Sequence, residues 1–194
     1  MNQEAVLDEF RDAGALLEGH FKLSSGKHST VYCQCALVLK DPWRAEKLVA
    51  EFVRQIRESG VEIDMVVSPA MGGVVIGWEV ARQLGVPGVF TERVDGKLEL
   101  RRGFKIPAGA RVLMMEDIIT TGLSSRECIE TINDWGGNVV AAGCLINRSG
   151  GRADVGAPIT ALATIDAPIF DPDNLPDDLK SVPAIKPGSR GLAK

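Results

Sequence analysis

VLMMEDIITTGLS, residues 112–124, is the stretch of sequence from which the fold can be predicted. It starts with an unbroken apolar run, which is typical of a strand buried on both faces of a parallel sheet. Two adjacent carboxylates, Glu116 and Asp117, follow where we expect the strand to end, and a Thr/Gly/Ser turn then leads into a helical pattern. The segment therefore predicts a strand–turn–helix unit of an α/β fold.

The turn and the acidic pair of this segment suit different chemical groups. Small residues at positions 120–124 would present free backbone N–H groups and the positive end of a helix dipole, which favour phosphate. The carboxylates would repel phosphate, so they suit hydroxyl groups or a developing positive charge. Because ligands bind beyond the carboxyl ends of the strands in open α/β sheets, we predict a ligand site here.

The composition is typical of one globular domain, with 194 residues, of which 45% are hydrophobic and 25% charged. A net charge of −4 argues against a general nucleic-acid-binding role. No apolar run approaches the ~20 residues of a membrane span, and the N-terminal residues lack a signal-peptide core, so we expect a cytoplasmic protein. The cysteines lack zinc-site spacing, and we expect them to be reduced core residues: Cys33, Cys35, Cys128 and Cys144.

Strand and helix patterns alternate through the rest of the chain. Helical periodicity predicts helices at residues 2–18, 42–59, 74–84 and 124–135. Apolar runs predict further strands at residues 63–67, 88–92, 139–146 and 160–165. Residues 19–33 read as a hairpin, and the tail from Ala167 is expected to be irregular. The alternation predicts a mainly parallel, twisted sheet flanked by helices.

Two more loops, residues 68–73 and 147–151, follow predicted strands and should lie at the same edge of the sheet as the acidic pair. Residues 93–109 are a basic excursion in which Asp95-Gly96 predicts a two-residue hairpin turn. A long basic excursion between buried strands is more often functional than decorative, and a solvated basic face is the alternative. The motifs of P-loop, dinucleotide-binding, zinc-hydrolase and serine-hydrolase proteins are absent.

Residues 112–124 resemble the phosphoribosyl-pyrophosphate signature of the type I phosphoribosyltransferases. Four apolar residues, an acidic pair and a Thr-Thr-Gly-x-Ser turn carry the resemblance. The segments that narrow it to the orotate phosphoribosyltransferases are residues 21–29, 68–73, 98–104, 147–148 and 186–191. This family implies transfer of the phosphoribosyl group of 5-phosphoribosyl 1-pyrophosphate to orotate, giving orotidine 5′-monophosphate and pyrophosphate in UMP biosynthesis, with Mg²⁺.

The resemblance also implies a role for each part of the signature. Glu116 and Asp117 would accept hydrogen bonds from the ribose hydroxyls and favour an oxocarbenium-like transition state. Mg²⁺ would be held mainly by substrate and water, with no protein ligand set. The signature residues that would bind phosphoribosyl pyrophosphate are Glu116, Asp117, Ile118, Ile119, Thr120, Thr121, Gly122, Leu123 and Ser124.

Other loops complete the implied site. Ala70, Met71 and Gly72 would offer backbone N–H groups to pyrophosphate, and the non-proline cis peptide of related enzymes is expected at Ala70-Met71. Orotate would be bound through its carboxylate by the Arg148 guanidinium, together with Thr120 and Lys27.

The basic excursion, residues 93–109, would be a flexible catalytic lid that excludes water and acts on the neighbouring subunit's site, which implies a homodimer. Arg93, Lys97 and Arg101 or Arg102 are the candidates to cover pyrophosphate, and Lys97 and Arg101 are assigned catalytic roles. The chain departs from some members of the family, which carry lysine at the positions of Met71 and Ser24 and an Asp-Asp pair in place of Glu-Asp.

The expected architecture is a single phosphoribosyltransferase domain over residues 1–194, with the type I fold and a small hood from residues 1–40 and 167–194. Two other functions stay open. One is a phosphoribosyltransferase that uses a purine base, and the other is a non-catalytic regulator that senses phosphoribosyl pyrophosphate on the same fold. An α/β protein without such a site is disfavoured, because motif and context agree.

Overall fold

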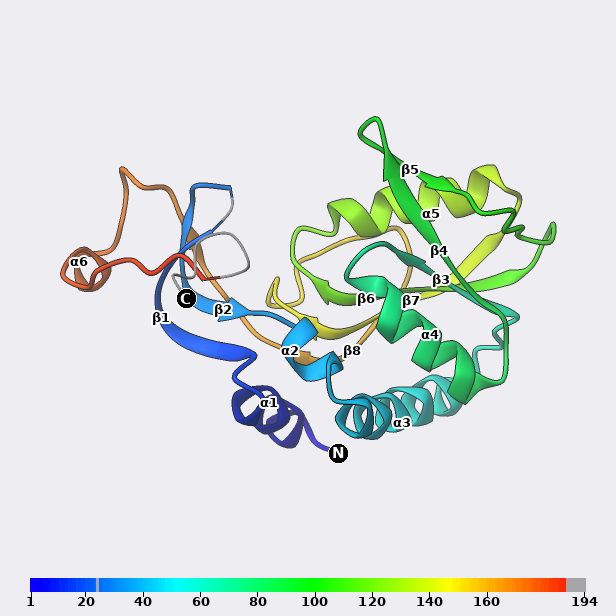
Figure 1. The fold of residues 1–194 in the computed structure, drawn as a ribbon, viewed down its shortest axis with the longest axis horizontal. Helices are drawn as coiled ribbons and strands as arrows, with labels where there is room; N and C mark the ends of the chain where they lie inside the picture. Colours follow the sequence, from blue (N-terminus) through cyan, green and yellow to red (C-terminus); the bar gives the residue numbers. More distant parts are fainter. Residues whose placement is uncertain (24, 188–194) are drawn as a thin grey trace.

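A six-stranded sheet forms the centre of the computed structural model, which describes residues 1–23 and 25–187 (Figure 1). The strand order is β5-β4-β3-β6-β7-β8, and all neighbours are parallel except β4 and β5. The strands are β3 (Met65–Pro69), β4 (Gly88–Val94), β5 (Lys97–Leu100), β6 (Arg111–Ile119), β7 (Asn138–Asn147) and β8 (Ile159–Thr164). The predicted mainly parallel α/β sheet is confirmed.

Helices cover both faces of this sheet (Figure 1). One layer holds α1 (Gln3–Asp12), α3 (Pro42–Glu58) and α4 (Gly73–Leu84), and the other holds α5 (Leu123–Asp134). In β6, Leu113 and Met115 pack with the first layer, whereas Val112 and Met114 pack with α5. This strand is therefore buried on both faces, as its apolar run predicts. Within the described part of the chain, no helix has the length and apolar content to cross a membrane.

Local sequence signals set the ends of α3 and α4. Asp41 caps α3, because its carboxylate accepts hydrogen bonds from the backbone N–H groups of Trp43 at 3.1 Å and Arg44 at 3.4 Å. Gly85 ends α4 in the left-handed conformation, with a φ of 77°. Both boundaries agree with the sequence prediction.

The first helix is shorter than predicted. α1 ends at Asp12 instead of near residue 18, and Gly14 follows with a φ of 66°. Leu16 and Leu17 continue the helical spacing, but they lie in β1 (Leu16–Lys22), which is antiparallel to β2 (His28–Cys33). The hairpin prediction is thus confirmed. The helix prediction is wrong beyond Asp12, because Gly14 ends the helix earlier than the sequence pattern indicates.

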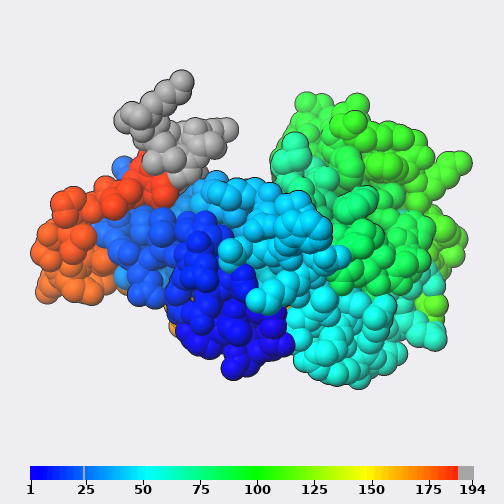
Figure 2. All heavy atoms as spheres, turned by 60° about the horizontal axis from the view of Figure 1, so that its bottom comes forward, coloured from blue at the N-terminus to red at the C-terminus, as the bar shows by residue number. Residues whose placement is uncertain are grey.

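The N-terminal hairpin and the C-terminal tail share a second sheet, of order β1-β2-β9. β9 (Ile169–Phe170) pairs with β2, and Ile185 forms a bridge with Phe21 of β1. Figure 2 shows these segments together at one end of the molecule. The tail was expected to be irregular, yet it holds β9 and α6 (Asp177–Lys180); α2 (Ala36–Leu39) was not predicted either. Ser24 and positions 188–191 of the family motif in the tail lie outside the described residues.

The acidic pair lies inside β6 and not after it. The ladder between β6 and β7 continues past Asp117, where Ile118 faces Ile146. The strand extends further than predicted because β7 is ten residues long and supplies backbone partners to the end of β6. Successive side chains of a strand point to opposite faces, so Glu116 points toward α5 and Asp117 points toward the α4 layer.

Gly143 of β7 gives a test of how closely α3 packs on the sheet. A Cβ at this position would lie 2.3 Å from Cζ of Phe52 and 2.7 Å from Sδ of Met115. We expect Gly143→Ala to lower the free energy of unfolding by about 1–3 kcal/mol through overpacking. Urea unfolding measures the effect, and adding Phe52→Leu should restore part of the loss; equal costs with and without Phe52→Leu would contradict this account.

Candidate active site

The turn after β6 leads into the N-terminus of α5. Gly122 has a φ of 74°, and a Cβ there would lie 2.8 Å from a side-chain carbon of the loop after β7, so both conformation and space require glycine. Arg126 braces the turn by donating to the backbone oxygens of Thr121 at 3.0 Å and Asp154 at 2.6 Å. Because the first N–H groups of a helix have no partner within it, this turn is suited to an anion.

The two carboxylates occupy different surroundings. Glu116 is buried, and its Oε1 accepts a hydrogen bond from Ser124 Oγ at 2.7 Å while its Oε2 accepts one from Ser125 Oγ. Oδ1 of Asp117 accepts a hydrogen bond from the backbone N–H of Ile118 at 2.9 Å. Burial raises the pKa of both carboxyl groups, and the charge of Asp117 raises that of Glu116 further. A hydroxyl donor or a positive charge brought to the pair would favour its ionised form.

The turn after β3 contacts Asp117. The peptide bond between Ala70 and Met71 is cis, which confirms the prediction, and the N–H of Ala70 donates to the backbone oxygen of Thr91 at 2.8 Å. A Cβ at Gly72 would lie only 2.8 Å from Oδ1 of Asp117. The pairing of β3 with β6 therefore brings this turn against the acidic pair, and glycine is required at position 72 by the closeness of the carboxylate.

A cavity of about 430 Å³ joins the turn of α5 to the loop after β7. Arg148 lies in its wall with only 8% of its surface exposed, and Nη2 donates to Ser29 Oγ at 3.5 Å. Burial lowers the pKa of the Arg148 guanidinium, which forms no ion pair with a carboxylate of the described residues. The cavity is lined by Thr120, Thr121, Arg126, Arg148, Ser149, Arg152, Ala153, Asp154, Ala167, Pro168 and Ile169.

Two of the predicted site cations, Lys27 and Arg93, do not line the cavity of Arg148. Lys27 is half exposed and pairs with Asp171 at 3.2 Å, so it does not line the cavity of Arg148. Arg93 donates to the backbone oxygen of Gly96 at 2.5 Å and pairs with Glu127 of α5. These contacts place the first predicted lid cation on the outer surface of α5.

The rest of the basic excursion forms and follows the hairpin of β4 and β5. Asp95-Gly96 makes the predicted two-residue turn, with both residues at positive φ. Arg102 pairs with Glu92 at 2.8 Å, whereas Lys97 lies on β5 and Arg101 directly follows it. None of these side chains lines the cavity of Arg148, which is formed beyond the ends of β6 and β7, whereas β4 and β5 lie on the other side of β3.

Sequence analysis did not single out two residues that shape this site. Ser125 holds Glu116, and Arg126 holds Thr121. Both residues belong to the first turn of α5, and their side chains therefore lie close to the end of β6. Their position directly after the Thr-Thr-Gly-x-Ser turn was the available signal.

Comparisons with known proteins agree with this geometry. Residues 39–173 match the phosphoribosyl transferase domain family. An orotate phosphoribosyltransferase of Phenylobacterium zucineum is 55% identical over 192 residues, which cover 99% of both chains. One from a Methylobacterium species is 56% identical over 191 residues, covering 98% of this chain and 97% of its relative.

The chain belongs to the orotate phosphoribosyltransferase family. A solved orotate phosphoribosyltransferase from Aeropyrum pernix has the same fold, with a TM-score of 0.64 and 28% identity over 82% of this chain and 93% of that one. The predicted family and fold class are therefore confirmed. As a member of the orotate phosphoribosyltransferase family, the protein is a transferase.

Asp117→Asn tests the acidic pair, because it removes the charge and keeps the shape. We expect kcat for phosphoribosyl transfer to fall by about 10²–10³-fold, since a preorganised charge is lost. At pH 7 the free energy of unfolding should stay equal or rise, because burial disfavours the ionised carboxyl.

The pH dependence of the Asp117→Asn effect follows from the direction of the pKa shift. The folded-state pKa of Asp117 is raised above 3.8, so the stability gain of the variant is complete above that folded-state pKa. It disappears as the pH falls toward 3.8. Urea unfolding at several pH values measures this trend, and an unchanged kcat would remove Asp117 from the mechanism.

Proposed function

We propose that the protein transfers the phosphoribosyl group of phosphoribosyl pyrophosphate to orotate, giving orotidine 5′-monophosphate and pyrophosphate in cytoplasmic UMP biosynthesis. The observation that carries this proposal is the convergence on one cavity of the helix N-terminal turn of residues 120–121 and a buried Arg148 that pairs with no carboxylate of the described residues. The acidic pair, with Glu116 buried and Asp117 partly buried, lies in the strand that leads into this turn. Relatives over the full chain are named orotate phosphoribosyltransferase, which supports the same substrate.

In the proposed complex, the 5′-phosphate lies at the N-terminus of α5. Backbone N–H groups of residues 120–124 and the hydroxyls of Thr120, Thr121 and Ser124 donate to its oxygens. The turn of Ala70, Met71 and Gly72 offers N–H groups to pyrophosphate. In this proposal the sugar lies over the end of β6, between the two anion sites. The backbone of Ile118, Ile119 and Leu123 lies beneath it.

The acidic pair acts on the sugar in this proposal. Glu116 and Asp117 accept hydrogen bonds from the ribose hydroxyls, and their negative charge stabilises the positive charge that develops as the bond from C1 to pyrophosphate breaks. Their buried surroundings have a low dielectric, which strengthens this interaction. The new bond then forms between C1 and N1 of orotate, and N1 releases its proton.

Arg148 selects the base. A planar guanidinium matches the orotate carboxylate with two parallel hydrogen bonds, and Thr120 adds a further donor from the same cavity. A neutral purine would leave the buried guanidinium without a counter-charge, which disfavours that alternative. A regulator that only binds phosphoribosyl pyrophosphate would not have to stabilise a developing positive charge, so the intact acidic pair favours a catalyst. Lys27 pairs with Asp171 on the outer surface, and we propose for it only a supporting electrostatic role near the entrance.

In this proposal, Mg²⁺ is held mainly by oxygens of the substrate and by water. Among the described residues, no three His, Cys, Asp or Glu side chains converge in a manner that could hold a metal ion. Both carboxylate oxygens of Glu116 accept serine hydrogen bonds, so Asp117, beside the pyrophosphate turn, is the acidic group best placed to contact a hydrated ion. When bound, Mg²⁺ would neutralise the leaving pyrophosphate.

The two ends of the chain supply a hood in this proposal, and residues 93–109 supply a lid. Residues 1–40 and 167–194 would cover the base, because Ser29 of β2 contacts Arg148 and Ile169 of β9 lines the same cavity. Arg93, Lys97 and Arg101 would cover the pyrophosphate of a neighbouring subunit; within its own chain, Arg93 pairs with Glu127 of α5.

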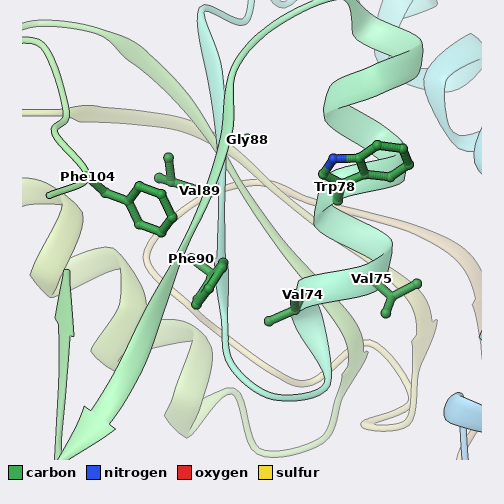
Figure 3. A pocket seen from close by; sticks show the side chains of 7 residues that line it. All are labelled: Val74, Val75, Trp78, Gly88, Val89, Phe90 and Phe104. Atoms are coloured by element: carbon green, nitrogen blue, oxygen red, sulfur yellow. The ribbon is translucent and has the colours of Figure 1, made fainter. Parts of the chain in front are cut away.

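An apolar groove supports the proposed homodimer. A cavity of about 390 Å³ lies between α4, β4 and the segment after β5, lined by Val74, Val75, Trp78, Gly88, Val89, Phe90 and Phe104 (Figure 3). Trp78 is 63% exposed, and Met71 of the adjoining pyrophosphate turn is 82% exposed. Exposed apolar surface of this kind is typical of an interface. In a two-fold symmetric dimer, the same groove of both copies would lie in one interface.

Orotate consumption tests the proposed function. Purified protein with phosphoribosyl pyrophosphate, Mg²⁺ and orotate should release orotidine 5′-monophosphate, and hypoxanthine or adenine should give no product. Arg148→Ala should raise the KM for orotate by about tenfold or more, because a charge-assisted pair is lost, and should leave the KM for phosphoribosyl pyrophosphate close to wild type. Turnover of a purine alone, or a variant defective only toward phosphoribosyl pyrophosphate, would contradict the assignment.

Trp78→Glu tests the dimer and the lid together. We expect the variant to sediment as a monomer, because a buried carboxylate without a partner opposes association. Its activity should be low in dilute solution and rise with protein concentration, since the lid would come from the second subunit. Trp43→Glu on α3, where the side chain is 80% exposed, is the matched control and should stay dimeric. A fully active Trp78→Glu monomer would exclude a lid acting between subunits.

A further inference from the structure

The hydroxyl of Ser124 has two prospective partners, and this inference rests on the proposed function. In the structure, Ser124 Oγ donates to Oε1 of Glu116 at 2.7 Å. In the proposed complex, the same hydroxyl donates to the 5′-phosphate. A serine hydroxyl carries a single proton, so it cannot donate to both groups at once.

Ser125 differs from its neighbour in what it can reach. It has no exposed surface, and its Oγ donates to the other oxygen of Glu116, Oε2. A ligand in the turn cannot contact a side chain that is fully enclosed between α5 and β6. Its hydrogen bond with Glu116 therefore persists when Ser124 changes partner.

Glu116 depends on these two hydroxyls. The carboxylate is 6% exposed and forms no ion pair with a cation of the described residues. A buried carboxylate that loses its donors is disfavoured in its ionised form. Without Ser125, moving Ser124 to the phosphate would leave Oε2 without a donor, and Oε1 without one until a ribose hydroxyl reaches it.

We propose that Ser125 is a positioning residue that holds Glu116 by Oε2 while Ser124 passes from Oε1 to the 5′-phosphate. The exchange frees Oε1 to accept a hydrogen bond from a ribose hydroxyl. Binding of the phosphate and recognition of the sugar are thereby coupled through one carboxylate, and Ser125 keeps that carboxylate in its orientation throughout.

The substitutions Ser125→Ala, Ser125→Thr and Ile132→Val test this role. Ser125→Ala should lower kcat/KM for phosphoribosyl pyrophosphate by about tenfold to a hundredfold, the range for one hydrogen bond to a charged group. The KM for orotate at saturating phosphoribosyl pyrophosphate should change by less than about twofold, because Arg148 does not contact Ser125. Ser125→Thr keeps the hydroxyl and should recover most of the activity.

Ile132→Val is the matched control for a purely structural effect. Ile132 is fully buried on the same helix, and loss of one methylene group destabilises the core without touching Glu116. We expect its kcat/KM to equal that of the wild type, with urea unfolding recorded for every variant. Equal kinetic losses in Ser125→Ala and Ile132→Val, or wild-type kinetics in Ser125→Ala, would overturn the proposal.

Adding Ser124→Ala separates the exchange from a static contact. If both hydroxyls serve Glu116 in turn, the double variant should lose more activity than the product of the two single effects, because Glu116 is then left without a donor. Multiplicative effects would show that the serines act independently and would overturn the exchange. The wild type is assayed in parallel: wild-type protein that fails to convert orotate would refute the proposed function, whereas an active wild type with unaffected variants would refute only this inference.

Discussion

The constraint on which the rest of the site depends is that two adjacent carboxylates, Glu116 buried and Asp117 partly buried, lie on opposite faces of β6. Glu116 points into the α5 layer, where Ser124 and Ser125 supply its hydrogen bonds. Asp117 points to the other face, where the glycine of the turn after β3 leaves room for it. A buried carboxylate is tolerated when hydrogen-bond donors reach it. Ser124 and Ser125 donate to Glu116, and the backbone N–H of Ile118 donates to Asp117. The apolar part of β6 is packed on both faces.

Close packing surrounds β6 and the turn that follows it. Gly143 of β7 admits the ring of Phe52, so that α3 lies close against the sheet, and Gly122 lets the turn of α5 contact the loop after β7. Three parts of the candidate site follow the adjacent strands β3, β6 and β7: the turn of residues 70–72, the turn of residues 120–124, and Arg148. The proposed anion sites would therefore lie side by side at one edge of the sheet, as a consequence of the strand order.

Periodicity and capping signals predicted most elements because they act within a few residues. Asp41 and Gly85 mark helix ends through their own backbone hydrogen bonds and φ angle. The same approach was wrong after Asp12, where apolar spacing in Leu16 and Leu17 fits a helix and a strand equally well until the partner strand is known. The strand end at Glu116 was also placed too early, because β7 extends the ladder beyond the charges.

The sequence by itself determined most of the elements, the signature turn and the family, because these features depend on residues that are adjacent or a few positions apart in the sequence. Only the tertiary structure decided which side chains meet. Ser29 reaches Arg148 across 119 residues, Gly72 lies against Asp117, and Lys27 pairs with Asp171 and not with the cavity. Such contacts depend on strand order and on the packing of separate layers, since the free energy of a long-range contact is realised only once the whole sheet is assembled.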